Sequence, residues 1–221
     1  MDINNNNYIA LDVTYNEKIL KKRSSPQTVH ILTEEFNSYM DANNADIFSH
    51  MANLEWLYDK IPENLEGKLR YKDHTWDFMA ASYNRIGMIA AVSEKVKNIF
   101  ESLKISDSDY ALKPIKVKGT DLTYYLLFVK HIPEYKVSMK DSEICLSLVP
   151  SQKLYFQTYD EMKRFETSAS SNSLRYLTIA LPCEYQKKDI IAVQGSIFCF
   201  FSNRIIDEFE KNNVKGYDYN Y

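Results

Sequence analysis

The residue types best suited to chemistry lie together in one short segment, Asp73–Asp77, which reads Asp-His-Thr-Trp-Asp. A carboxylate beside a histidine can raise the pKa of the imidazole and orient it as a general base. Adjacent residues point in different directions in both helices and strands, however. We therefore interpret His74 and its neighbours as a polar turn beside an anchoring tryptophan.

The other histidines, His30, His50 and His131, are solitary in the sequence. No His-x3-His or Glu-x-x-His spacing occurs, so a metal site would need ligands from distant segments. The sequence therefore predicts no metal site. It also contains no Gly-x-Gly-x-x-Gly and no Gly-x4-Gly-Lys-Ser/Thr motif, so we expect no nucleotide cofactor.

Tyr159–Glu161 contains two adjacent acids, Asp160 and Glu161. Paired-acid catalysis needs two carboxyl groups held about 5–10 Å apart around a substrate, which the sequence does not indicate. We interpret the segment as the solvated start of a helix.

The three cysteines, Cys145, Cys183 and Cys199, are widely spaced and each lies in apolar sequence. An odd number without a Cys-x-x-Cys pair favours neither a disulfide framework nor a redox or metal motif. Free cysteine packs like a small apolar residue. We expect buried, reduced thiols and no catalytic nucleophile.

Composition places the chain among ordinary globular proteins, since 45% of its 221 residues are hydrophobic and 26% are charged. With 27 basic and 30 acidic residues the net charge is -3, which disfavours a nucleic-acid partner. The longest apolar stretches, Tyr124–Val129 and Ile197–Phe201, are far shorter than the roughly 20 residues that span a bilayer. The Asn-rich opening lacks the pattern of a secretory signal. We expect a cytoplasmic protein without membrane segments.

Helices are expected in the N-terminal part of the chain. Leu32, Phe36, Tyr39 and Met40 have the spacing of a short amphipathic helix. A second helix is predicted over Asp46–Tyr58, and Ile61–Pro62 would end it. Before these, the basic run at residues 21–23 is interpreted as a solvated loop.

An internal repeat at an offset of 109 residues links residues 87–105 with residues 196–214. Each copy has an apolar run, a serine, an apolar helix face and a Phe-Glu pair. The pattern predicts a buried strand that leads directly into a helix, with Ser93 or Ser202 as the N-cap. After the second helix, Asn212–Asn213 and Gly216 suit a left-handed exit. Either a true duplication or the recurrence of a favoured unit could produce this repeat.

Between the copies, the pattern changes to strands. Residues 110–117 and 122–130 predict a β-hairpin joined by a turn at residues 118–121. Further strands are expected at Glu143–Val149, Lys153–Thr158, Arg175–Leu181 and Ile190–Val193. The sequence thus predicts an α+β protein with a helical N-terminal part, residues 1–85, and a sheet-rich part with two Ser-capped helices, residues 86–221.

The alternation of Tyr217, Tyr219 and Tyr221 has two interpretations. Tyrosine is enriched in binding hot spots, but aromatic residues are also favoured in strands. An ordinary edge strand is our expectation, with an interface as the alternative.

Several short motifs occur in a recognisable order. They are a Ser-capped helix, a strand with Tyr110, Leu112, Pro114 and Ile115, a strand with Tyr124, Tyr125, Leu127 and Val129, a helix with Ser202, Ile205 and Phe209, and a tail with Val214, Gly216 and Tyr217. This order resembles the bacterial immunity proteins of polymorphic toxin systems, in particular the immunity protein 11 type, formerly a domain of unknown function. The resemblance covers residues 85–221. It departs from the family at residues 131–135, where the usual acidic segment is replaced by His-Ile-Pro-Glu-Tyr.

The resemblance implies a cytoplasmic, non-catalytic protein that binds a cognate protein toxin and neutralises it by occlusion. A mildly acidic surface would suit a basic, nuclease-like toxin. Two other functions stay open from the residues alone. One is an enzyme with a dispersed site, and the other is an adaptor module that binds a peptide by strand addition at an open sheet edge.

Overall fold

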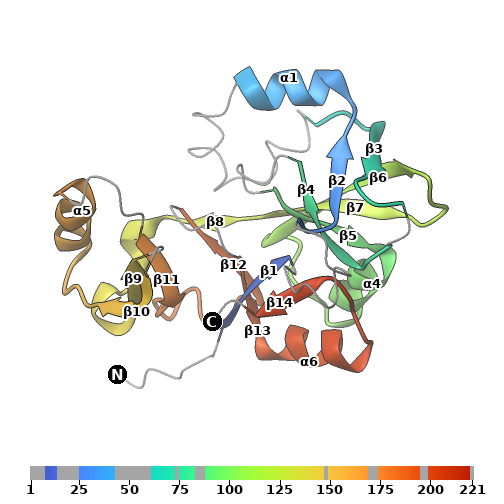
Figure 1. The fold of residues 1–221 in the computed structure, drawn as a ribbon. Coiled ribbons are helices and arrows are strands. Elements are labelled where there is room, and N and C mark those ends of the chain that lie inside the picture. Colours follow the sequence, from blue (N-terminus) through green and yellow to red (C-terminus); the bar gives the residue numbers. More distant parts are fainter. Residues whose placement is uncertain are drawn as a thin grey trace.

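A computed structural model describes residues 8–13, 25–42, 61–72, 75–82, 88–146, 149–168, 174–194 and 199–219. Figure 1 shows their arrangement into three sheets with helices at the periphery. Several positions considered above lie outside these residues: the basic run at 21–23, the predicted helix Asp46–Tyr58 with His50, Asp73, His74 and Tyr221.

The first sheet is a closed barrel of six strands in the order β2-β3-β6-β7-β5-β4. Its strands are β2 (Thr28–Ile31), β3 (Leu65–Leu69), β4 (Phe78–Ala81), β5 (Met88–Ser93), β6 (Tyr110–Lys118) and β7 (Tyr124–Val129). Apolar side chains such as Val29, Leu126 and Phe128 fill the interior. A Cβ at Gly67 would lie only 2.8 Å from Cγ1 of Val29, so β3 can approach β2 only with glycine there.

The second sheet has five strands in the order β14-β1-β13-β12-β8. They are β1 (Tyr8–Val13), β8 (His131–Ile132), β12 (Ile190–Val193), β13 (Cys199–Ser202) and β14 (Tyr217–Tyr219). The first strand of the chain lies between two of the last three, so both ends of the described chain contribute to one sheet.

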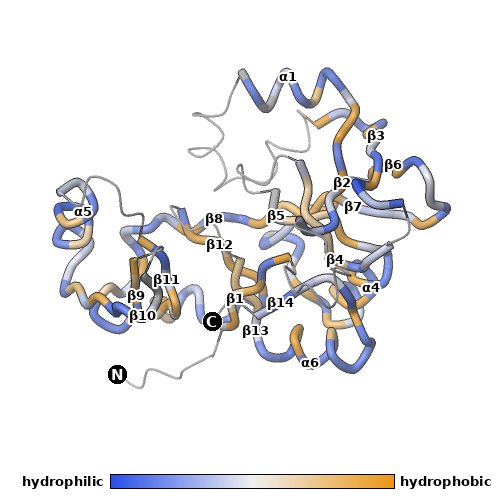
Figure 2. Tube along the Cα trace, in the orientation of Figure 1, coloured by the Kyte–Doolittle hydropathy of each residue, from blue (hydrophilic) through white to orange (hydrophobic). Residues whose placement is uncertain are grey.

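A third, three-stranded sheet lies to the left in Figure 1 and belongs to a segment that we call the insert module, residues 133–178. The module contains the 3-10 turns η1 (Glu134–Lys136) and η2 (Met139–Asp141), the strands β9 (Glu143–Leu146), β10 (Val149–Leu154) and β11 (Leu174–Thr178), and the helix α5 (Tyr159–Ser168). Its apolar residues pack against Ile191, Val193 and Phe200 of the second sheet. In Figure 2 the hydrophobic colour follows the strands, and α5 is largely hydrophilic.

The barrel and the second sheet contain the same five-strand unit twice. In the barrel, β2 pairs with β4 in parallel, and β4-β5, β5-β7 and β7-β6 are antiparallel. In the second sheet, β8 pairs with β12 in parallel, and β12-β13, β13-β1 and β1-β14 are antiparallel. The match of five strands in order and direction favours duplication of a whole unit over recurrence of a strand and a helix.

The helices of the two copies also correspond. The helix α4 (Glu94–Ser102) follows β5 without a loop, and α6 (Asn203–Lys211) follows β13 in the same way. A residue with positive φ follows each helix closely, Lys104 after α4 and Asn213 after α6. This confirms the left-handed exit expected at Asn213. The next amide then donates to the phenylalanine carbonyl of the last turn, Ile105 to Phe100 at 3.0 Å and Val214 to Phe209 at 2.9 Å.

The copies differ in two places. In the barrel, β3 lies between β2 and β6 and closes the sheet. The second copy has no described strand at that position, and its chain passes from β8 through the insert module to β12. The other difference is the turn at residues 119–123, which joins β6 to β7. No such turn joins the corresponding strands of the second copy, β14 and β1, because they belong to opposite ends of the chain.

The prediction of a helical N-terminal part is wrong. The described residues before position 85 form the four strands β1 to β4 and one helix, α1 (Glu34–Ala42), which confirms the amphipathic spacing around Phe36. These strands were not predicted because they are only four to six residues long and depend on pairing with strands elsewhere in the chain, as β1 does with β13 and β14. The barrel contains three strands from before residue 85 and three from after it. The division into residues 1–85 and 86–221 stays a prediction.

Most predictions for the later residues agree with the structure. The hairpin is β6 and β7, Ile190–Val193 is β12, and the strands expected near residues 143 and 175 are β9 and β11. The strand expected at Lys153–Thr158 is displaced, since β10 ends at Leu154. The last residues of that prediction instead lead into α5.

The two serines stand at the N-cap positions of α4 and α6, but they do not cap the helices with their side chains. Each hydroxyl instead donates to an aspartate in front of the neighbouring strand, Ser93 to Asp77 and Ser202 to Asp189, both at 2.8 Å. The predicted role of the hydroxyl was therefore wrong, because a partly buried carboxylate competes successfully for it.

We expect Phe209→Ala to lower the free energy of unfolding by about 3–5 kcal/mol, because the ring is fully buried and its removal leaves a cavity. The ring contacts those of Phe100, Phe201 and Tyr217, with centroids 5.5–6.1 Å away. Denaturant unfolding would measure the change. Leu122→Ala is the control, since Leu122 is exposed and should change stability by less than about 0.5 kcal/mol. Equal effects of the two variants would contradict the assignment of Phe209 to the core.

Candidate functional site

An aspartate, a serine and a basic residue form the same cluster in both copies. Asp77 accepts hydrogen bonds from the Ser93 hydroxyl at 2.8 Å and from Lys95 Nζ at 2.9 Å. Asp189 accepts from the Ser202 hydroxyl and from the guanidinium of Arg204. In each case the backbone amide of the serine also donates to the aspartate carbonyl at 2.8 Å.

One cluster joins the start of α4 to the start of β4, and the other joins the start of α6 to the start of β12. Burial opposes ionisation of Asp189, but the hydrogen bonds from Arg204 and Ser202 outweigh it and hold the pKa of this carboxyl below its ordinary value. An arginine stays protonated and cannot serve as a base. The recurrence of the cluster with either lysine or arginine therefore indicates a structural role.

A groove lies beside the first of these clusters, and we call it the α4–α6 groove. It has a volume of about 610 Å³. Its lining comes from the start of β4, the end of β5, α4, the β6–β7 turn and the end of α6: Asp77, Ser93, Glu94, Lys95, Asn98, Ile99, Ser102, Leu122, Thr123, Glu208 and Asn212. Leu122 is 53% exposed and belongs also to a neighbouring hollow of about 440 Å³ on the other side of the turn.

A second surface lies on the insert module, and we call it the aromatic patch: Tyr135, Lys136, Tyr159 and Lys163. The Tyr135 and Tyr159 rings meet edge to face, with centroids 6.5 Å apart. Lys136 Nζ lies 5.8 Å from the Tyr135 centroid, and Lys163 Nζ lies 5.7 Å from that of Tyr159. Tyr135 is 61% exposed, so a large aromatic surface faces solvent.

Buried polar contacts hold this patch in place. Glu134, next to Tyr135, is buried and accepts a hydrogen bond from the hydroxyl of buried Tyr176 at 3.1 Å. Lys163 Nζ lies 3.0 Å from the other oxygen of Glu134 and 2.6 Å from Glu166. Burial and the nearby Glu134 carboxylate raise the pKa of Tyr176, so its hydroxyl stays a donor. The exposed Tyr135 ring and the partly buried Tyr159 ring are therefore held by buried contacts of their neighbours.

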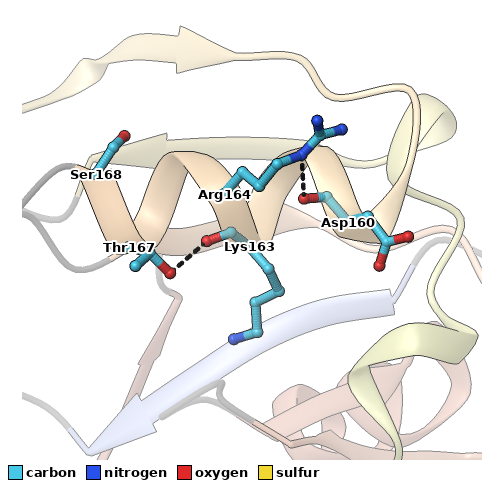
Figure 3. A pocket seen from close by; sticks show the side chains of 5 residues that line it. All are labelled: Asp160, Lys163, Arg164, Thr167 and Ser168. Carbon is cyan, nitrogen blue, oxygen red and sulfur yellow. Dashed lines mark hydrogen bonds between the residues drawn. The ribbon is translucent and has the colours of Figure 1, made fainter.

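A further hollow, of about 790 Å³, lies along α5. Figure 3 shows that all five of its labelled residues lie on α5. The hydrogen bonds drawn there stay within the helix, from Arg164 Nε to the Asp160 carbonyl and from the Thr167 hydroxyl to the Lys163 carbonyl, whereas Lys163 Nζ also reaches Glu134 outside the helix. Among the described residues no other element contributes to the lining, so we interpret it as a solvated helix surface.

The described histidines lie in different sheets. His131 is buried on β8, and burial lowers its pKa to about 4. Among the described residues its Nδ1 has no hydrogen-bond partner. His30 is half-buried on β2, and burial, with Arg70 and Lys68 nearby, lowers its pKa. The part of the chain that the structure describes contains no group of three or more metal-ligating side chains.

The acidic pair on α5 begins that helix, as predicted. The Thr158 hydroxyl accepts from the Glu161 amide at 3.2 Å, and the Glu161 carboxylate accepts from the Gln157 amide at 2.7 Å. The Thr158 side chain thus satisfies the Glu161 amide, and the Glu161 side chain satisfies the Gln157 amide, in an arrangement like that of a capping box.

Two of the three cysteines are buried, Cys145 and Cys199, and burial raises the pKa of each thiol. The prediction of burial is wrong for Cys183, which is exposed. Its apolar neighbours misled the prediction, because the chain turns immediately after buried Leu181.

Tyr217 and Tyr219 lie on β14, an edge of the second sheet, as expected. Both rings pack against the core beneath α6. The functional features that sequence reasoning missed are the exposed Tyr135 and the partners of the two serines. The only local signal for Tyr135 is the preceding proline, which favours a tight turn.

No family model matches the chain, and no curated protein matches it. Among the described helices, none has both the length and the apolar character required to span a bilayer.

Protonation of His131 should destabilise the fold. Because its folded-state pKa of about 4 lies below the ordinary value of 6.5, the unfolded chain binds the proton first as the pH falls. The free energy of unfolding should therefore decrease by about 2 kcal/mol between pH 7.5 and pH 5. His131→Leu should remove most of this decrease in denaturant titrations, whereas His30→Leu should remove less of it, because His30 is only half-buried. A wild-type stability that is flat across this range would refute the assignment.

Proposed function

We propose that this chain is a non-catalytic immunity protein that acts in the cytoplasm, where it binds a cognate bacterial toxin domain and neutralises it by occlusion. The observation that carries the proposal is the aromatic patch. Its Tyr135 ring is exposed and contacts the partly buried Tyr159 ring, and the buried Glu134–Tyr176 pair supports both.

Pre-ordered aromatic side chains suit tight protein binding. A tyrosine buries a large area on association and loses little conformational entropy when its ring is already held. Lys163 contributes to this order because it bridges Glu134 and Glu166 while lying over the Tyr159 ring. Stoichiometric occlusion needs no reacting groups, only a surface of this kind and enough contact area around it.

The resemblance to immunity proteins supports the same proposal. The motifs that carry it lie on β6, β7 and α6, where Leu127, Val129 and Phe209 are buried. They therefore describe the scaffold rather than the contact surface. This distribution suits a family whose members share a frame and bind different toxins.

Co-expression with a toxin-bearing open reading frame adjacent in the genome tests the proposal. We expect the chain to restore growth and to co-purify with the toxin domain in a stoichiometric complex. Failure of both would contradict the proposal. Turnover of a small compound by the purified protein, lost on replacement of a single polar side chain, would favour an enzyme instead.

Within that complex, Tyr135→Ala is expected to raise the Kd about 30-fold or more, because a central aromatic anchor contributes about 2 kcal/mol or more. Tyr155→Ala is the matched control, since Tyr155 is 64% exposed on the same module and lies outside the patch. It should change the Kd less than about threefold. Titration calorimetry would measure both, and equal effects would exclude the aromatic patch as the anchor.

A further inference from the structure

We infer that the α4–α6 groove is a second docking site, which binds an extended polypeptide segment carrying lysine or arginine beside an apolar residue. This site is separate from the aromatic patch and goes beyond the proposed function. Its lining residues come from both copies of the duplicated unit, since α4 belongs to the first and α6 to the second.

Charge selects a cationic occupant. The lining contains three carboxylates, those of Asp77, Glu94 and Glu208, and one ammonium, that of Lys95, which gives a net charge of -2. Lys95 pairs with Asp77. Glu208 pairs with Lys211 on its own helix, but Lys211 is 73% exposed, and so exposed a pair is weak enough to yield to a ligand cation.

The first backbone amides at the start of α4 already have acceptors, so they are not available to bind an anion. The Ser93 amide donates to the Asp77 carbonyl at 2.8 Å, and the Glu94 amide donates to the Thr123 carbonyl at 3.3 Å. The carboxylates of Asp77 and Glu94 are the acceptors at this end of the groove, and they favour a donor that is positively charged.

The shape favours a polypeptide over a small molecule. Small-molecule sites are mostly apolar and enclose most of the ligand. This groove is open, because Glu94, Ser102 and Asn212 on its lining are exposed, and it would not enclose a small ligand. Leu122 offers an apolar contact on one wall, close to Ile99 on the lining, so an apolar side chain beside the cation would be accommodated.

Comparison of the copies indicates that the groove is an added feature of the first. The wall that bears Leu122 and Thr123 is the turn between β6 and β7. The corresponding strands of the second copy, β14 and β1, are not joined by a turn. In that copy Arg204 binds both oxygens of Asp189, whereas in the first copy the shorter Lys95 contacts one oxygen of Asp77.

Binding of a short labelled peptide of alternating lysine and leucine to the full chain tests the inference by fluorescence anisotropy at low ionic strength. We expect saturable binding that weakens as salt is added. A peptide of alternating glutamate and leucine should not bind. If it binds equally well, or if the lysine peptide does not bind, the inference is overturned.

Variants locate the site. The double variant Glu94→Gln/Glu208→Gln should raise the Kd about three- to tenfold. Leu122→Ser should also weaken binding. Glu101→Gln is the matched control, because Glu101 lies on α4 outside the lining and pairs with Lys97. If the control weakens binding as much as the double variant, the effect is a general one of net charge and the groove is excluded. These outcomes are independent of whether the chain neutralises a toxin.

Discussion

The apolar seam between the two copies of the five-strand unit is the constraint on which the rest of the structure depends. The outer face of the barrel, with Phe78 and Val92, packs against Leu11 and Phe201 of the second sheet. The stacked rings of Phe100 and Phe209 join α4 to α6 across the same seam. Burial of so many apolar side chains is the main favourable contribution to folding. It also explains why the first strand of the chain must reach the last, since β1 supplies part of the seam.

The elements outside this seam are not constrained by it in the same way. The insert module and the β6–β7 turn are the places where the two copies differ most clearly, and the exposed large hydrophobic residues of the described chain, Leu122, Tyr135 and Tyr155, all lie on them. Loops and insertions on a fixed frame are where binding residues usually occur. The two surfaces also differ in chemistry, because one presents aromatic rings and the other presents carboxylates around a leucine.

Local patterns were sufficient for elements whose signals lie within a few residues. The hairpin of β6 and β7 has apolar, β-branched and aromatic residues on either side of a polar turn, and α6 has its apolar stripe at Ile205, Ile206 and Phe209. The capping box at Thr158 and Glu161 is likewise local. The N-terminal strands carry no such signal. A segment such as β4, whose four residues are all buried, becomes a strand because β5 and β2 flank it. The hydroxyls of Ser93 and Ser202 were placed correctly along the chain, but their acceptors lie 16 and 13 residues earlier.

The sequence by itself determined the strand–serine–helix unit, its repetition and the hairpin, because each depends on neighbouring residues and on hydrophobic periodicity. Tertiary structure decided that the barrel closes, that the second copy is completed from the opposite end of the chain, and that Tyr135 meets Tyr159 over a buried carboxylate. These features depend on contacts between residues far apart in the chain, and the free energy of such contacts appears only when the apolar faces pack together.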